Sequence, residues 1–274
     1  MAQRHFLTVN NMRLAYLDFG GTGTPLLLIH GLMVSGAMYE PVLPALTRHY
    51  RVIVPDLRGH GHSGALPGPY HVEQLAHDLV QLLDDLQIDA VNVLGYSQGG
   101  AVAQQFAHDY PKRVRGLVLA CTFAYNMLSR RERLEGMLAP WLVRILGVRQ
   151  MGRLAIDHGG GQRVPPKTAD WLEEIIAAND KVRMVAAVEA MKAFDSRSWL
   201  HPITSPTLVI AGAQDEAVPF AHAQMLVQGI PGAQLRVVDG AGHFLIFTHT
   251  DIFVQAVEAF LASANRTSKV TVTQ

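Results

Sequence analysis

The apolar positions of this 274-residue chain form two kinds of segment that alternate along most of its length. Short, nearly uninterrupted apolar runs are typical of strands buried on both faces, whereas apolar residues recurring about every 3.6 positions are typical of amphipathic helices. The short runs predict strands at Leu26–His30, Val52–Pro55, Val91–Tyr96, Val114–Cys121, Thr207–Gly212 and Gln234–Val238. The longer segments predict helices at Val72–Leu86, Gly99–Tyr110, Phe220–Gly229 and Thr250–Ala262.

The N-terminal segment follows a different pattern. Apolar and polar residues alternate in Phe6–Val9 and again in Arg13–Asp18, with Asn10 and Asn11 between them. Strict alternation interrupted by turn-forming residues predicts an antiparallel hairpin. Since strands and helices alternate after it, we expect a doubly wound, mostly parallel sheet covered by helices.

Between Thr122 and Pro202 the strand pattern stops, although helical patterns continue at Arg131–Leu146, Thr168–Asn179 and Lys181–Phe194. A structureless loop of this length is rare inside a compact domain. We therefore expect a helical cap over the carboxyl ends of the strands. The predicted division is a core at 1–122 and 203–265, a cap at 123–202 and a frayed polar tail at 266–274.

The first predicted cap helix has a broad apolar face. The face consists of Leu134, Met137, Leu138, Trp141, Leu142 and Ile145, and Arg130, Arg131, Arg133, Arg144 and Arg149 flank it. A helix lying on a membrane surface can show this pattern. We favour the simpler interpretation, in which the apolar face packs inside the cap and the arginines are solvated.

Composition narrows the function classes. Lys plus Arg and Asp plus Glu number 23 each, so net charge gives no reason to expect nucleic acid or an acidic membrane surface as a partner. The single cysteine, Cys121, excludes an intramolecular disulfide and is expected to be an inert core thiol. A secretory leader and an apolar run of the ~18 residues that a membrane span needs are both missing, so we expect a cytoplasmic protein.

The most informative motif is Gly95-Tyr96-Ser97-Gln98-Gly99, directly after a predicted buried strand. A serine between glycines at a sharp strand-to-helix turn exposes its hydroxyl, while backbone N–H groups at the helix N-terminus face the position where negative charge develops. This arrangement is typical of a hydrolase with Ser97 as the nucleophile.

A serine nucleophile needs a histidine base and a carboxylate that orients the histidine. Asp215 follows the predicted strand Thr207–Gly212, and His243 follows the predicted strand Gln234–Val238. Open α/β sheets place their sites at the carboxyl ends of the strands, so these groups are expected to meet Ser97. Glu216 and Asp239 are alternative acids, and His249 is an alternative base that we assign to a local role instead.

Two backbone N–H groups are needed to bind an oxyanion. We expect them from Gln98 and from Leu32, or from Met33 if the loop after Leu26–His30 is wound one residue further. His30 is expected to tether that loop. The segment Asp56-Leu57-Arg58-Gly59-His60-Gly61-His62-Ser63 lacks the ligand spacing of a zinc site and is expected to be a rigid loop forming the pocket floor. We therefore expect neither a metal nor a cofactor.

Together these segments resemble the α/β-hydrolase superfamily. The matching residues are His30-Gly31, Asp56–Ser63, Gly95–Gly100, Asp215 in Gly212–Pro219, and Gly240–His243. The resemblance implies an eight-stranded, mostly parallel sheet with a helical cap inserted after the sixth strand. It also implies a Ser97–His243–Asp215 triad with Leu32 and Gln98 as oxyanion donors.

Within the superfamily the chain resembles small carboxylesterases, enol-lactonases and cofactor-free perhydrolases, and the stretch Ser97–Pro111 resembles intracellular polyhydroxyalkanoate depolymerases. Carbon–carbon bond hydrolases share the triad. Haloalkane dehalogenases use an aspartate nucleophile, so Ser97 disfavours them. We predict a carboxylic ester hydrolase acting on small-molecule esters of short to medium apolar acids, with Met33, Met137, Leu138 and Trp141 as substrate-binding residues. The apolar cap face also suggests a homodimer.

Overall fold

The structure, a computed structural model, describes residues 3–64 and 70–270, which form an eight-stranded sheet. The strand order is β1-β2-β4-β3-β5-β6-β7-β8; β2 is antiparallel to both β1 and β4, and the other neighbouring pairs are parallel. The strands are β1 (Arg4–Val9), β2 (Met12–Asp18), β3 (Thr24–Ile29), β4 (Tyr50–Pro55), β5 (Val91–Tyr96), β6 (Val114–Ala120), β7 (Thr207–Gly212) and β8 (Gln234–Val238). The predicted fold class is confirmed.

The N-terminal hairpin is confirmed as well. β1 pairs with β2 in register from Arg4 opposite Leu17 to Val9 opposite Met12. The two turn residues, Asn10 and Asn11, have positive φ angles of 46° and 58°. Asparagine tolerates this left-handed conformation better than most residues, and a two-residue hairpin with the right-handed twist of its strands requires it.

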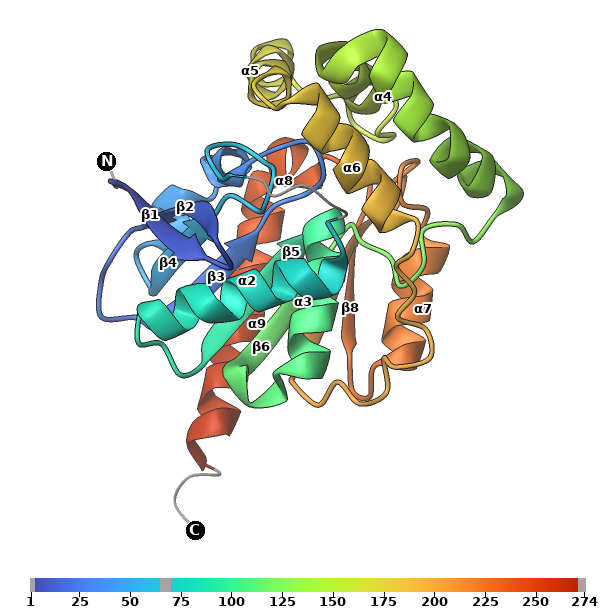
Figure 1. Ribbon diagram of the computed structural model, residues 1–274. Helices are drawn as coiled ribbons and strands as arrows, with labels where there is room; N and C mark the ends of the chain where they lie inside the picture. The colour runs from blue at the N-terminus through green and yellow to red at the C-terminus, as the bar shows by residue number, and fades with distance from the viewer. Residues whose placement is uncertain (1–2, 65–69, 271–274) are drawn as a thin grey trace.

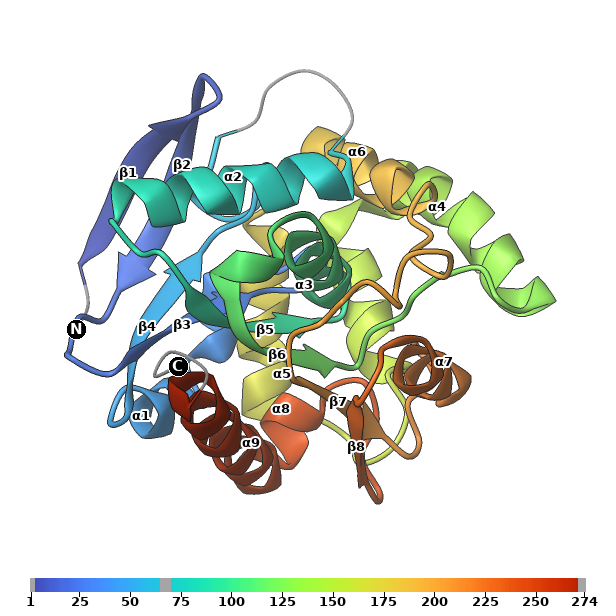
Figure 2. The same ribbon diagram turned by 90° about the horizontal axis from the view of Figure 1, so that it is seen from below.

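Helices cover both faces of the sheet (Figure 2). One face carries α2 (Val72–Asp85), α3 (Gln98–Asp109) and α7 (Ala221–Gly229), and the other carries α1 (Leu43–Leu46), α8 (Leu245–Thr248) and α9 (Thr250–Val270). Two short 3₁₀ turns, Gly36–Tyr39 and Pro111–Arg113, complete the core elements. None of the described helices combines the length and the apolar character needed to cross a membrane.

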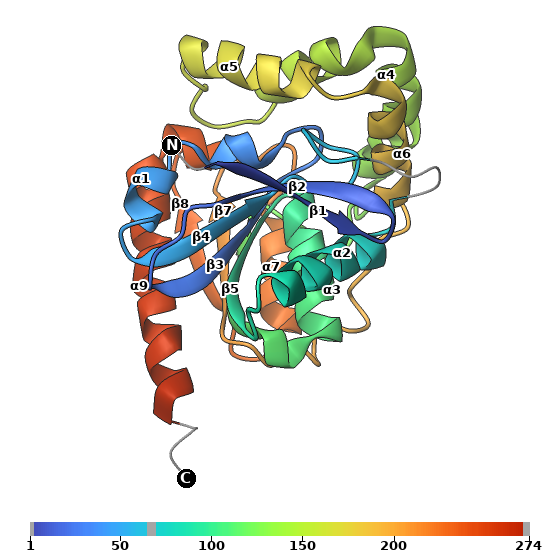
Figure 3. The same ribbon diagram turned by 60° about the vertical axis from the view of Figure 1, so that its left-hand side comes forward.

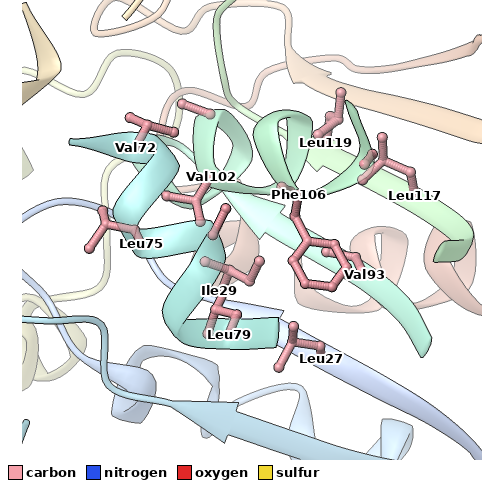
Figure 4. Packing of buried hydrophobic residues seen from close by; sticks show 14 of the residues in the cluster. Leu27, Ile29, Val72, Leu75, Leu79, Val93, Val102, Phe106, Leu117 and Leu119 are labelled. Carbon is pink, nitrogen blue, oxygen red and sulfur yellow. The ribbon is translucent and has the colours of Figure 1, made fainter. Parts of the chain in front are cut away.

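Each central strand supplies two hydrophobic cores because successive side chains point to opposite faces. Leu27 and Ile29 of β3 pack under α2 and α3, beside Val102 and Phe106 (Figure 4). Leu26 and Leu28 join the second core under α9. All four β3 side chains are fully buried, and burial of each stabilises the fold by roughly 1.5–3 kcal/mol.

Three helices lie together above one end of the sheet (Figures 1 and 3). They are α4 (Arg130–Asp157), α5 (Pro166–Ala177) and α6 (Lys181–Met191). The chain enters and leaves this region side by side, since Tyr125 pairs with Asp195 and the Ser196 N–H donates to the Ala124 carbonyl at 2.8 Å. The cap is therefore a single insertion between β6 and β7.

The expected packing of the first cap helix is wrong. Leu134, Met137, Trp141 and Ile145 are 55–61% exposed instead of packed. The helix turns its other face inward, where Val143 is fully buried and Ala139 packs against the second core. In addition, Gly147 has a φ of 81° and a ψ of 169°, so α4 is two helices joined at a kink.

The prediction of a frayed tail at 266–274 is wrong for residues 266–270, which are helical. Helix α9 continues through Arg266 to Val270. Neither glycine nor proline interrupts this stretch, so the helix has no local reason to stop at Asn265. Positions 271–274 lie outside the described residues.

A buried ion pair joins the loop after β4 to helix α2. The Arg58 guanidinium donates to both oxygens of Asp78 at 2.8 and 2.7 Å, and the two side chains are only 6% and 2% exposed. The Asn10 side-chain amide also donates to Asp78 at 2.7 Å, which connects the hairpin to the same carboxylate.

We predict that Asp78→Asn lowers the free energy of unfolding by about 3–5 kcal/mol, because it leaves the Arg58 charge buried and unpaired. Urea denaturation followed by circular dichroism measures this change. Asp84→Asn is the matched control, since Asp84 is 60% exposed in its pair with Arg113. An exposed pair contributes only about 0–1 kcal/mol, so equal effects of the two substitutions would contradict the prediction.

Candidate active site

Ser97 lies at the turn between β5 and α3, with an unusual backbone conformation of φ 53° and ψ −119°. Its carbonyl accepts hydrogen bonds from the Gly100 N–H at 2.9 Å and the Thr122 hydroxyl at 2.6 Å. The turn is compact because α3 begins against the end of β3, where a Cβ at position 99 would collide with the Ile29 and His30 carbonyls. Glycine at position 99 is therefore required by close approach.

The structure brings Ser97, His243 and Asp215 together. Ser97 Oγ lies 3.1 Å from His243 Nε2, and His243 Nδ1 lies 3.0 Å from Asp215 Oδ2. The other oxygen of Asp215 accepts hydrogen bonds from the Ala217 and Val218 N–H groups at 3.0 and 2.7 Å. Burial and the two amide hydrogen bonds hold the Asp215 carboxylate in one orientation. In that orientation its Oδ2 contacts His243 Nδ1 and orients the imidazole.

The alternative acids and the alternative base lie elsewhere. Glu216 and Asp239 are exposed, and within the described residues neither bonds to His243. The His249 ring contacts the neighbouring Thr248 hydroxyl at 2.9 Å, in keeping with the local role expected for it.

The loop that carries His243 is held from two sides. From below, the buried Tyr96 hydroxyl donates to the His243 carbonyl, and burial raises the pKa of Tyr96 so that it remains a donor. From the cap, the Gly159 carbonyl accepts from the His243 N–H at 2.7 Å, and the Gln162 N–H donates to the Gly240 carbonyl at 2.7 Å. The cap therefore supports the histidine loop directly.

The expected oxyanion donors lie on either side of Ser97. Gln98 begins α3 immediately after the serine, and Leu32 follows β3 in a loop whose Gly31 lies beside the Ser97 side chain. Within the residues that the structure describes, neither the Leu32 nor the Gln98 N–H donates to a protein acceptor. Their role as oxyanion donors stays a prediction.

Asn179, which sequence reasoning did not select as a site residue, holds in place the loop after β3 that carries Leu32 and Met33. We call this segment the oxyanion loop. Its side-chain amide donates to the Met33 carbonyl at 2.9 Å, and its side-chain oxygen accepts from the Gly61 N–H at 2.8 Å. Met33 has a φ of 63°, which is unfavourable for a residue with a long side chain. Asn179 follows helix α5 of the cap, so nothing in the local sequence relates it to a loop 146 positions away.

His30 tethers its loop, as expected. Its Nε2 accepts from the Leu57 N–H at 2.8 Å, which leaves Nδ1 to donate to the Gly31 carbonyl at 2.7 Å. Complete burial lowers the pKa of His30 and keeps it in this neutral form. The loop Asp56–Ser63 is densely hydrogen bonded, with Asp56 accepting from the Gly36 and His62 N–H groups at 2.8 Å. The loop does not form a pocket floor, however, because it does not line the cavities beside Ser97.

Two cavities meet at Ser97 and His243. The first has a volume of about 200 Å³ and an almost entirely apolar lining, which includes Met33, Leu172, Ile176 and Phe247. The second has a volume of about 250 Å³ and contains polar groups, among them Asn126, Glu132 and His222. A larger hollow of about 680 Å³ lies beyond Phe244 and does not include Ser97.

Three residues predicted to bind substrate are not brought to the site. Met137, Leu138 and Trp141 are 61%, 44% and 56% exposed, and none of them lines the two cavities at Ser97. The reason is the orientation of α4, which turns its bulky face outward. Met33 does line the first cavity. The residues of α4 that line it are Gly152 and Ala155, and not the predicted residues of its outer face.

Cys121 lies under the site. Its sulfur and ligand atoms of Asp215 and His243 are all within 4.8 Å of one another, a grouping that can in principle hold a metal ion. Burial raises the pKa of the Cys121 thiol well above its usual value, so it remains protonated at neutral pH. A protonated thiol is a poor metal ligand, and both other groups are engaged in the hydrogen bonds to Ser97 and to each other.

Comparisons with known proteins agree with the fold. A family model described as "alpha/beta hydrolase fold" matches residues 24–250. The chain is 35% identical over 240 residues to a poly(3-hydroxyalkanoate) depolymerase of Ectopseudomonas oleovorans, covering 87% of this chain and 84% of that protein. It is 31% identical over 268 residues to 3-oxoadipate enol-lactonase 2 of Acinetobacter baylyi, covering 94% and 97%. Among solved structures, a thermophilic esterase from Thermogutta terrifontis has a TM-score of 0.87 and 30% identity, covering 96% and 99%.

We predict that Asn179→Ala lowers kcat for p-nitrophenyl acetate by roughly tenfold to a hundredfold and changes KM little. The predicted loss follows from the expected role of the Leu32 N–H as an oxyanion donor, since release of the adjoining Met33 would displace it and an oxyanion donor acts on the transition state more than on bound substrate. Steady-state kinetics measures both constants.

Asp180→Ala is the matched control. Asp180 is the neighbouring residue and caps α6 by accepting from the Arg183 N–H at 3.0 Å, without contact to the oxyanion loop. Its loss costs the cap about 1 kcal/mol of stability but is expected to preserve kcat. If both variants lose kcat equally, Asn179 acts only through general cap stability.

Proposed function

This chain belongs to the α/β-hydrolase fold family, and from that premise we propose that it cleaves carboxylic esters of short to medium apolar acids through an acyl-enzyme. The observation that carries the proposal is the continuous set of hydrogen bonds from Ser97 through His243 to Asp215. This arrangement supplies a nucleophile, a base and an orienting acid within contact distance.

In the proposed first step, Ser97 Oγ attacks the ester carbonyl carbon while His243 Nε2 takes the hydroxyl proton. Asp215 holds the imidazole in the tautomer whose Nε2 is free to accept, and it stabilises the imidazolium that forms. The Leu32 and Gln98 N–H groups then donate to the oxyanion of the tetrahedral intermediate. Each donor of this kind contributes roughly 3 kcal/mol to transition-state stabilisation.

In the proposed second step, His243 returns the proton to the leaving alcohol as the carbon–oxygen bond breaks. Water then attacks the acyl-enzyme, with His243 again as the base, and the carboxylic acid leaves with Ser97 restored. Two proton transfers use the 3.1 Å contact between His243 Nε2 and Ser97 Oγ: removal of the hydroxyl proton in the first step and its return to Ser97 at the end. The other two run between Nε2 and the oxygen of the leaving alcohol or of the attacking water.

The linings of the two cavities support placing the acyl chain of the ester in the first cavity and its alcohol in the second. The first cavity is apolar and about 200 Å³ in volume, so it suits an acyl chain of several methylene groups. The second cavity carries Glu132, for which burial opposes ionisation but hydrogen bonds from His222 and Ser129 lower the pKa overall. A polar alcohol is therefore the better occupant of the second cavity.

Hydrolysis of hydroxyalkanoate oligoesters is a second candidate. Such a substrate continues on both sides of the scissile bond, and cavities on two sides of Ser97 can accept both parts. The 35% identity to a poly(3-hydroxyalkanoate) depolymerase supports this candidate. The experiment compares hydrolysis rates on three substrates. A 3-hydroxyoctanoate dimer tests the oligoester candidate, a simple octanoate ester tests the ester candidate, and a lactone tests lactone hydrolysis.

We predict that Ser97→Ala and Asp215→Asn each lower kcat for p-nitrophenyl butyrate by roughly 10⁴-fold, through loss of the nucleophile and of the correct imidazole tautomer. Glu216→Gln, a change at an exposed neighbouring carboxylate, is expected to leave kcat nearly unchanged. Full activity in Ser97→Ala, or a loss in Glu216→Gln equal to that in Asp215→Asn, contradicts the proposed mechanism.

We also predict that Ala155→Phe shifts the preferred acyl length toward shorter chains, because position 155 lines the first cavity. The measurement is kcat/KM for p-nitrophenyl esters from acetate to palmitate. Leu154→Phe enlarges the adjacent side chain, which is 43% exposed and lies outside that cavity, and should keep the wild-type profile. An unshifted profile in Ala155→Phe assigns the acyl chain to another cavity.

A further inference from the structure

The outer half of α4 exposes a stripe of large apolar side chains to solvent. We call this set the outer stripe; it consists of Leu134, Met137, Leu138, Trp141 and Ile145, each 44–61% exposed. Figures 1 and 2 show the N-terminal half of α4 at the margin of the molecule. Contiguous apolar surface of this kind is unusual on a monomer and marks an interaction site.

The stripe points away from the protein because of helix geometry. At about 100° per residue, Leu134, Leu138, Trp141 and Ile145 fall on one side of the helix. Positions 132, 136, 139 and 143 fall on the opposite side, where Glu132 bonds to His222 and Val143 is fully buried. The helix is thus already packed through its other face, and turning the stripe inward would break those contacts.

Three of the basic residues beside the stripe have no carboxylate partner within the described part of the chain. By the same geometry Arg130 lies within the stripe, and Arg133 and Arg144 lie along one edge of it. None of these three arginines forms an ion pair with any residue in the described part of the chain, although Arg133 donates to the Met127 carbonyl at 3.1 Å. The carboxylate on the other edge, Glu135, is already paired with Arg131 at 2.6 Å.

We propose that the outer stripe docks on an anionic lipid surface, with α4 lying in the plane of the interface. A helix with leucine and tryptophan on one side and arginine beside them suits the boundary between acyl chains and anionic headgroups. A second copy of the chain fits less well, since a two-fold interface would bring the unpaired arginines of both copies together without free carboxylates between them.

Docking in this way would place lipid next to the site. The inward side of the same helix turn, at Glu132, Gly136 and Ala139, lines the second cavity, which reaches Ser97. The outer stripe and the second cavity are therefore opposite faces of one helix. Surface binding is separable from hydrolysis, because none of the stripe residues lines either cavity at Ser97.

The test is sedimentation of the full chain with sucrose-loaded vesicles. Vesicles of phosphatidylcholine mixed with phosphatidylglycerol are compared with vesicles of phosphatidylcholine alone, at low and at high salt. The assay is run with the wild-type chain and with Ser97→Ala, so that binding is scored independently of any hydrolysis. We expect binding to the anionic vesicles, weakening as salt screens the arginines.

The double variant Leu134→Gln with Ile145→Gln is expected to lower the partition coefficient at least tenfold while hydrolysis of p-nitrophenyl butyrate is retained. Arg130→Gln with Arg144→Gln is expected to lower it by about tenfold on anionic vesicles only. Val182→Gln is the matched control, because Val182 is 74% exposed on α6, outside the stripe, and its loss should change nothing.

Two outcomes overturn the proposal. One is equal or absent sedimentation with both vesicle compositions. The other is a dimer in analytical ultracentrifugation that Leu134→Gln with Ile145→Gln dissociates, since a second copy would then cover the stripe. Loss of hydrolysis in Ser97→Ala with vesicle binding unchanged bears on the proposed function and leaves this inference standing.

Discussion

The left-handed backbone of Ser97 is the constraint on which the rest of the site depends. A non-glycine residue in such a conformation costs roughly 1–3 kcal/mol, so its surroundings must hold it there. They do so through the hydrogen bonds from Gly100 and Thr122 to its carbonyl and through the seating of Gly99 against the end of β3. The direction of the Ser97 hydroxyl is thus set by the adjacent strands β3, β5 and β6. The loops after β7 and β8 then place the acid and the base beside it.

This dependence explains why much of the site could be predicted from the sequence. Ser97, Asp215 and His243 each follow a strand closely, and buried parallel strands are visible as apolar runs. Parallel strands end at the same edge of a sheet, so local patterns are enough to predict that the three residues meet. The same reasoning placed the oxyanion loop after β3, because the only information needed was where a strand ends.

Two features could not be predicted because they depend on contacts between distant segments. Asn179 is an ordinary polar residue at the end of a helix until the fold brings it to Met33. Helix α4 has two faces able to pack, one bulky and one small. Periodicity identifies apolar positions but does not say which face of the helix packs against its neighbours. In the fold, the inward face of α4 carries Val143, which is fully buried, and Glu132, which bonds to the distant His222.

The hydrogen bonds from the cap to the loops of the site have a thermodynamic consequence. Gly159 and Gln162 hold the histidine loop and Asn179 holds the oxyanion loop, so opening of the cap and disassembly of the site belong to one equilibrium. Linkage then works in both directions: a phosphonate bound covalently at Ser97 stabilises the assembled state and with it the cap. Amide protons in α4 and α5 would exchange with solvent more slowly in the labelled protein, so that helices far from the nucleophile in sequence report on its occupancy.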